Sequence, residues 1–368
     1  MASPMMTTCW EAACASSASS RTREMVGVIV EKLVGPISFV TGWVVCVPLS
    51  VAMPTSSPPH DSPGTRTSPV LVLAASLIGI SFAAPLIRLS ASPAIVIATW
   101  RLGLSLLIVF AALLITGSWR EWRLLSRREI LLAGGAGMLL ALHFWSWNSS
   151  LRYTSVAASV ALVNLQPVLI AGISALWLHE SPSARQWVGV VIAVLGALVV
   201  GFADIPGGLS GLGAALSGGS SAEGSGRALF GDLLALIGAV TAALYYLIGR
   251  RLRQRVGVWA YVSIAYGAAF ATCIGLTLAS GDVLLPQPPR ELAIFAGLAI
   301  GPMLLGHTGM NWALGHLPAF VVNLTTLGEP IGATILAALL PGIAEVPGMW
   351  TVVGGVLVLG GVLLAARR

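Results

Sequence analysis

Two charged side chains lie deep inside apolar stretches of this sequence, where a charge is costly. Arg101 lies about eight residues, or roughly 12 Å of helix, into one stretch, and Glu329 lies about twelve residues into another. At such a depth in a membrane an ionisable residue costs about 2.5 kcal/mol or more, which makes it a functional candidate. Arg101 suits either the carboxylate of an anionic substrate or a clamp on backbone carbonyls between helices. Glu329 suits binding of a substrate or a proton, because burial disfavours its charged form, or hydrogen bonding to Thr325 and Thr326.

Further polar residues recur at helical spacing within the same apolar stretches. His143 and Trp147 share one helical face, and His307 and Asn311 share another. A polar face on an apolar helix must meet protein or a water-filled cavity, so these residues either line a substrate cavity or join helices by hydrogen bonds. The candidates for substrate binding or coupling are Arg101, His143, Trp147, Asn148, Asn164, Gln166, Tyr245, Tyr266, His307, Asn311, Trp312, Asn323, Thr326 and Glu329.

The composition excludes an ordinary soluble protein. Of the 368 residues, 56% are hydrophobic and 9% are charged, and the mean hydropathy is +0.89. The net charge of +6 does not indicate nucleic-acid binding, because the arginines form short clusters between apolar stretches, as in membrane proteins. The four cysteines, Cys9, Cys14, Cys46 and Cys273, lack the spacing of a metal site. We therefore expect a membrane protein with no metal, no cofactor and no catalytic residue.

Ten apolar segments of about 17–24 residues follow the N-terminal region, and this length crosses the hydrocarbon core of a bilayer as a helix. Only Leu151–Tyr153 separates the third segment from the fourth. The segments lie near 70–88, 93–116, 130–150, 154–178, 186–202, 229–249, 257–279, 292–314, 317–340 and 347–366. The sequence thus predicts an all-α membrane protein with ten transmembrane helices.

The ten segments form two copies of a five-segment unit. Seven residues of one copy recur in the other, among them Pro167, which matches Pro330 at 163 positions further on. By the same offset Gln166 occupies the place of Glu329. Because five is an odd number, the second copy enters the membrane from the opposite side, which predicts two inverted five-helix repeats. Inverted repeats with a site at the bilayer midplane are a recurring transporter design.

The domain boundaries follow from composition. We place the two repeats at 69–202 and 228–368, and the Gly- and Ser-rich residues 203–227 between them read as a linker outside the cell. Residues 1–68 read as an N-terminal extension that is either disordered or a mis-called start, with Met53 as the alternative first residue.

Arginines determine the predicted orientation. With the residues before the first span in the cytoplasm, eleven arginines fall in inside loops or at the C-terminus and four fall outside. We therefore expect a multi-pass protein with both termini in the cytoplasm.

A family resemblance rests on three motifs. They are SPAIVIATWR, ending at Arg101, LVNLQPVLIAGISALWLHESPSARQWVGVVIAVLGALVVG from Leu162, and LTTLGEPIGATILAALLPGIAEVPGMWTVVGGVLVLGGVLL from Leu324. On these motifs, about residues 70–366 resemble the drug/metabolite transporter superfamily, specifically its EamA-type, ten-span members. The resemblance implies export of amino acids, metabolites or drugs across the cytoplasmic (inner) membrane.

The sequence therefore favours a secondary transporter that exports a small molecule by alternating access. Its expected partners are a small-molecule substrate and the lipid bilayer, with protons as a candidate coupling ion and with no nucleic acid; no oligomeric state is predicted. An integral membrane enzyme is one alternative, although His179-Glu180 lacks the second histidine of a metalloprotease motif. A channel is the other alternative, although the sequence has no carbonyl filter motif.

Overall fold

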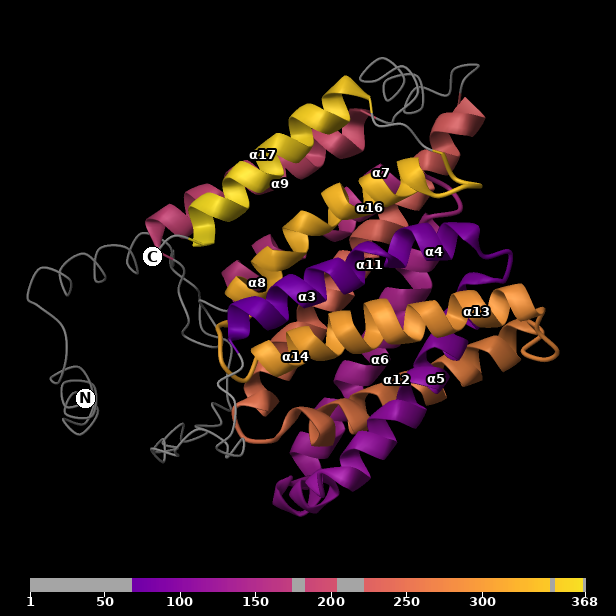
Figure 1. The fold of residues 1–368 in the computed structure, drawn as a ribbon, viewed down its shortest axis with the longest axis vertical. Coiled ribbons are helices and arrows are strands. Elements are labelled where there is room, and N and C mark those ends of the chain that lie inside the picture. Colours follow the sequence, from indigo (N-terminus) through magenta and orange to yellow (C-terminus); the bar gives the residue numbers. More distant parts are fainter. Residues whose placement is uncertain (1–67, 174–182, 204–221, 345–347, 367–368) are drawn as a thin grey trace, which may run out of the picture. The chain divides into compact units, whose positions relative to one another are not determined.

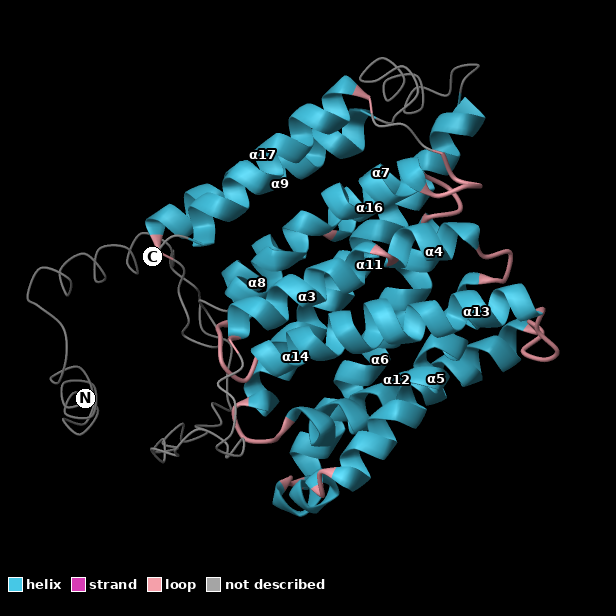
Figure 2. Ribbon diagram, viewed as in Figure 1, coloured by secondary structure: helices cyan, strands magenta, loops and turns pink. Residues whose placement is uncertain are grey.

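The structure is a computed structural model that describes residues 68–173, 183–203, 222–344 and 348–366. All of them belong to one unit of the chain, Ser57–Arg368. These residues form helices, turns and loops without a strand, which confirms the predicted all-α class (Figure 2). The expectations for the N-terminal extension, for most of the linker and for the metalloprotease-like dipeptide fall outside the described residues.

The described chain is a succession of helices joined by short loops (Figure 1). Before the linker the helices are α3 (Pro69–Ser81), α4 (Ala83–Leu89), α5 (Ala94–Ile115), η1 (Ser118–Leu124), α6 (Arg127–Ser150), α7 (Val156–Val163), α8 (Gln166–Ile173) and α9 (Ala184–Ala203). After it they are α11 (Ala222–Arg253), α12 (Val258–Ser280), α13 (Pro289–Leu298), η3 (Ala299–Thr308), α14 (Gly309–Ala313), α15 (Ala319–Leu324), η4 (Thr325–Gly328), α16 (Glu329–Leu339) and α17 (Met349–Ala366).

Within the described residues, seven helical stretches are long and apolar enough to cross a membrane. They coincide with the first three predicted segments and with the sixth to the ninth of the second half. The fourth, fifth and tenth predicted segments, which contain α7, α8, α9 and α17, are not among the seven.

The α-helix is interrupted near the middle of the fourth and ninth predicted segments, whereas the sequence predicted continuous helices. In the ninth the interruption is a 3-10 turn within one continuous helical stretch. In the first half α8 begins at Gln166 after a short break, and in the second half α16 begins at Glu329 after the 3-10 turn η4. A proline stands directly after each of these residues, as Pro167 and Pro330. Proline has no backbone N–H and clashes with the preceding turn, so it is tolerated at the start of a helix but not in its interior. The two breaks therefore have the same cause in both halves.

The eighth predicted segment is also irregular. Its middle part, η3, is a π-helix that contains Pro302, and π-helical turns are rare and often lie beside functional sites. Helix α3 packs closely on η3, because a Cβ added at Gly79 would lie 2.8 Å from the carbonyl oxygen of Gly301. Glycine at position 79 thus permits backbone contact between a helix of the first half and one of the second.

Helices from the two halves of the chain pack against one another throughout the described part. Helix α6 packs on α11 and α12, α5 on α12, α3 on η3 and α16, and α9 on α17 (Figure 1). The broken helices take part in this arrangement, since α8 contacts α11 and α15 and α16 contacts α7. A cavity at the breaks is consequently shared by both halves.

Candidate functional site

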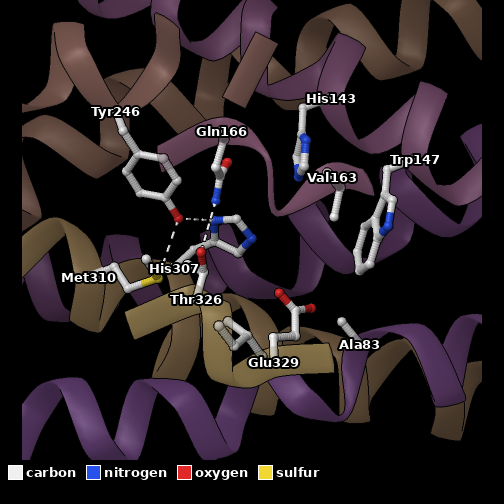
Figure 3. A pocket seen from close by; sticks show the side chains of 11 residues that line it. Ala83, His143, Trp147, Val163, Gln166, Tyr246, His307, Met310, Thr326 and Glu329 are labelled. Carbon is white, nitrogen blue, oxygen red and sulfur yellow. Dashed lines mark hydrogen bonds between the residues drawn. The ribbon is translucent and has the colours of Figure 1, made fainter. Parts of the chain in front are cut away.

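A small cavity of about 30 Å³ lies where the two broken helices meet (Figure 3). A cavity of this size holds about two water molecules. It is lined by Ile80, Ala83, His143, Trp147, Val163 and Gln166 from the first half and by Tyr246, His307, Met310, Thr326 and Glu329 from the second. The structure thus brings together six of the predicted site residues: His143, Trp147, Gln166, His307, Thr326 and Glu329.

Glu329 provides a carboxylate in the cavity wall. Its side chain is 7% exposed, and both carboxylate oxygens point into the space among the lining residues (Figure 3). The Nδ2 of Asn164 donates a hydrogen bond to Oε2 of Glu329 over 3.4 Å. The predicted alternative, a hydrogen bond from Thr325 or Thr326, is not present among the described contacts, because the hydroxyl of Thr326 donates to the backbone carbonyl of Asn323 over 2.7 Å.

Gln166 lies opposite Glu329 and is held by a directed chain of hydrogen bonds. The hydroxyl of Thr326 donates its only proton to the carbonyl of Asn323. Its oxygen can therefore only accept the 3.3 Å hydrogen bond, which Nε2 of Gln166 donates. This arrangement determines the orientation of the amide. Its other atom, Oε1, is buried and has no hydrogen-bond partner among the described residues.

Histidine and aromatic rings form another wall of the cavity. The Nδ1 of His143 lies 2.9 Å from the carbonyl oxygen of Gly238, and a carbonyl only accepts, so Nδ1 carries the proton. The ring of His143 stacks on Trp147 at 5.9 Å between centroids. Across the cavity, the hydroxyl of Tyr246 lies 3.1 Å from Nδ1 of His307. These contacts hold the rings in place around a narrow polar space.

Arg101 is fully buried but does not line the cavity. Its guanidinium lies over the ring of Phe144, 4.1 Å from the centroid, and Phe144 meets His307 edge-on. The predicted clamp on backbone carbonyls is not seen, since Nε and both terminal nitrogens lack a hydrogen-bond partner in the described part of the chain. The side chain of Phe144 thus lies between Arg101 and a residue of the cavity wall.

Asn148 and Asn311, which match each other in the repeat, join helices in the structure. The Nδ2 of Asn148 donates to the carbonyl of Ala94 over 3.2 Å. The Nδ2 of Asn311 donates to the hydroxyl of Tyr245 over 2.6 Å and to the carbonyl of His307 over 2.7 Å. Neither asparagine nor Tyr245 lines the cavity, so their observed contacts are those of interhelical hydrogen bonding.

Three further predicted residues also lie outside the cavity wall. The hydroxyl of Tyr266 lies 3.0 Å from that of Thr308, and Asn323 donates to a carbonyl of its own helix over 2.9 Å. Trp312 packs against His316, with ring centroids 4.1 Å apart.

Five lining residues were not among the predicted candidates. Tyr246 is the most informative, because it neighbours the predicted Tyr245 and its hydroxyl faces His307. Met310 carries a signal too, since it lies three residues after His307 on the same helical face. The others, Ile80, Ala83 and Val163, are apolar residues in apolar helices, and the sequence offers no signal for them.

Glutamates at the starts of α6 and α13 connect the two halves of the chain. Glu291 accepts hydrogen bonds from the hydroxyls of Ser90 and Ser92 and, over 3.1 Å, from the backbone N–H of Ala91. Glu129 forms an ion pair with Arg255. The two glutamates are 162 residues apart. Glu291 contacts the loop that precedes α5, and Glu129 contacts the loop that precedes α12, so each reaches into the opposite half. We call these contacts the Glu291 latch and the Glu129 latch.

The two latches differ in burial. The side chain of Glu291 is 6% exposed and that of Glu129 is 14% exposed, but Arg255, the partner of Glu129, is 67% exposed. Hydrogen bonds to a buried carboxylate are worth more than an exposed ion pair, which contributes about 0–1 kcal/mol. The Glu291 latch is therefore the firmer of the two.

A second matched contact lies near the latches. Arg88 donates to the carbonyl of Leu151, and Arg250 donates to the carbonyl of Leu314 over 2.6 Å. The arginines are 162 residues apart and the leucines 163, so the two halves repeat this contact.

The fold and the cavity define a multi-pass membrane protein built from two similar halves around one buried polar site. The profile of the EamA-like transporter family matches residues 67–202 and 229–367, and the chain belongs to that family. The protein is therefore a membrane transporter of the drug/metabolite type, with a small-molecule substrate and the lipid bilayer as its partners.

Comparison with solved structures agrees on the fold. A structure titled "Crystal structure of protein" superposes with a TM-score of 0.60 at 18% sequence identity, and the match covers 82% of this chain and 98% of that chain. Among curated proteins no relative matches.

Proposed function

We propose that this protein is a secondary transporter that exports a small metabolite, amino acid or drug across the cytoplasmic membrane by alternating access. The observation that carries the proposal is the pair of matched helix breaks, whose first residues, Gln166 and Glu329, face one cavity between the two halves. Transporters commonly bind their substrates at such discontinuous helices near the bilayer midplane.

The proposal includes ten spans arranged as two inverted repeats, at 69–202 and 228–368, with residues 203–227 outside and both termini in the cytoplasm. The repeated arginine contacts and the matched latches support this arrangement, because each element has a counterpart in the other half. In this orientation the Glu291 latch lies at the outer face and the Glu129 latch at the inner face.

The latches supply the gates that alternating access requires. Both are formed at the same time, as expected of a conformation in which neither gate has opened. Opening one latch while the other stays formed exposes the cavity to one side of the membrane only.

Glu329 is the proposed coupling residue, because it carries the one carboxylate in the cavity wall. A carboxyl group that exchanges a proton for a substrate must be deeply buried yet reachable when one face opens. Gln166 at the matched position cannot ionise, so coupling is confined to the second half.

Counterflow in proteoliposomes tests this function. Purified protein is reconstituted with a high internal concentration of an unlabelled solute, and uptake of the labelled solute is followed over a panel of amino acids, nucleosides and organic amines. A carrier gives transient accumulation of at least one labelled solute above its equilibrium level. Equilibration without accumulation for every permeant solute indicates a channel and contradicts the proposal.

A further inference from the structure

Hydrogen-bond acceptors without a donor lie in the cavity wall and directly beside it. Glu329 receives a single, long hydrogen bond, 3.4 Å from Asn164. The Oε1 of Gln166, a lining residue, is buried without a partner among the described residues. The Oδ1 of Asn164, which lies beside the cavity wall through its hydrogen bond to Glu329, is likewise buried without a partner there. Unpaired polar atoms in a protein interior cost about 1–3 kcal/mol each, so the site is incomplete without a donor.

The assignment of these atoms as acceptors follows from the neighbouring hydrogen bonds. Gln166 directs its nitrogen to Thr326, whose proton is already given to the backbone, and this leaves the amide oxygen free. Asn164 directs its nitrogen both to the carbonyl of Val160, over 2.8 Å, and to Glu329. Exchanging oxygen and nitrogen in Asn164 would set its oxygen against a carbonyl and a carboxylate, so its Oδ1 is the unpaired atom.

His143 adds a further acceptor to the cavity wall. Its Nδ1 donates to the carbonyl of Gly238, so Nε2 of the neutral ring has a free lone pair. The nearby guanidinium, that of Arg101, lies behind Phe144 and is not part of the wall. A substrate carboxylate placed in the cavity would meet the unpaired Nε1–H of Trp147 but no arginine or lysine among the lining residues.

A positively charged group that donates several hydrogen bonds complements this site. A primary ammonium has three N–H donors and one charge, which match the amide oxygens of Asn164 and Gln166 and the carboxylate of Glu329. A volume of about 30 Å³ accommodates an ammonium group with its adjoining carbon. The rings of His143 and Trp147 offer apolar faces to the carbon body of such a molecule.

We propose that the cavity binds the primary ammonium group of a small organic amine, through Glu329, Gln166 and Asn164, in preference to a zwitterion or an anion. This inference rests on the proposed transport function, because it names the class of substrate for the same site. Because the site would bind the ammonium through its N–H donors, it would also distinguish a primary amine from a quaternary one of equal charge.

Binding to the purified full-length protein tests the inference with four matched probes. They are 2-phenylethylamine, its N,N,N-trimethyl derivative, 2-phenylethanol and phenylalanine, measured by titration calorimetry. We expect 2-phenylethylamine to bind at least about tenfold more tightly than each of the other three, because only it presents three donors, a positive charge and no carboxylate. Equal binding of the trimethyl derivative, or tighter binding of phenylalanine, would overturn the inference.

Variants connect the binding to the cavity. E329Q and Q166L should each weaken binding of 2-phenylethylamine by about tenfold or more, since each removes one acceptor. D282N, which removes a carboxylate from the loop after α12, is the matched control and should bind as the unaltered protein does. Unchanged binding in both cavity variants would overturn the inference. A change in melting temperature with sodium chloride alone that is lost in E329Q would assign the acceptors to a metal cation instead, and would overturn it as well.

The outcome for transport is separable from the outcome for binding. Counterflow of a solute without an ammonium group, with no preference for amines, overturns the inference and leaves the proposed function standing. Tight and selective amine binding without counterflow of any solute supports the inference and contradicts the proposed function.

Discussion

Gln166 and Glu329 are 163 residues apart, yet each is the first residue of the second half of a broken helix, and both line the same cavity. Their positions are equivalent in the two halves, but one side chain is a neutral amide and the other a carboxylic acid. The chain thus combines a near-symmetric scaffold with an asymmetric site. On this asymmetry we propose proton or cation chemistry at Glu329.

The first prediction concerns coupling. E329Q preserves the shape and the hydrogen bonding of a neutral side chain while it removes titration. We expect normal amounts of this variant in the membrane and a loss of pH-driven uptake into vesicles, with exchange retained at substrate concentrations that saturate the weakened site. Survival of pH-driven uptake at the level of the unaltered protein would show that another residue couples transport to protons.

The second prediction concerns the close contact between α3 and η3. G79A places a Cβ 2.8 Å from the carbonyl oxygen of Gly301, so one backbone must move. Overpacking of this kind costs about 1–3 kcal/mol, and the melting temperature should fall. G275A in α12 is the control, because a Cβ at Gly275 meets no atom within 4 Å and alanine favours the helix, so the melting temperature should not fall. Equal melting temperatures for the two variants would contradict the observed packing.

The third prediction concerns the outer gate. E291A removes the acceptor of three hydrogen bonds at the Glu291 latch, whereas R255A removes an exposed ion pair at the Glu129 latch. We expect E291A to increase labelling of a cysteine introduced at Val163 by a membrane-impermeant reagent added outside. The R255A variant should leave this outside labelling nearly unchanged. Greater outside labelling in R255A than in E291A would reverse the assignment of the faces.

The fourth prediction concerns topology. Reporter fusions after Arg128 and after Arg255 should report the cytoplasm, and fusions within residues 217–225 should report the outside. A linker fusion that reports the cytoplasm would show that the two halves run parallel, and would contradict the inverted arrangement.

The sequence predicted the helical class and the family, because apolar length and the repeated prolines are local signals. It also selected Glu329 and Gln166, since a polar residue in the middle of an apolar helix is rare. It did not separate Tyr245 from Tyr246 or place Arg101 behind Phe144. The depth of a residue along a helix can be counted from the sequence. The direction in which its side chain points depends on which neighbouring helix packs on each face.

The helix breaks could be inferred only in part from the sequence. Pro167 and Pro330 were visible as matched residues, but a proline within a span is compatible with either a kink or a break. The structure shows breaks in both halves, and this result depends on how the neighbouring helices satisfy the freed backbone groups.

If the cavity opens to one face of the membrane at a time, locking the Glu291 latch must close the path from the outside. Cysteines replacing Ser92 and Glu291 are joined by a short bifunctional thiol reagent, in a protein that also carries V163C and lacks its native cysteines. We predict that crosslinking stops labelling of V163C from outside, preserves labelling from the cytoplasmic side and abolishes counterflow. Counterflow that continues at its original rate after complete crosslinking would contradict alternating access through this cavity.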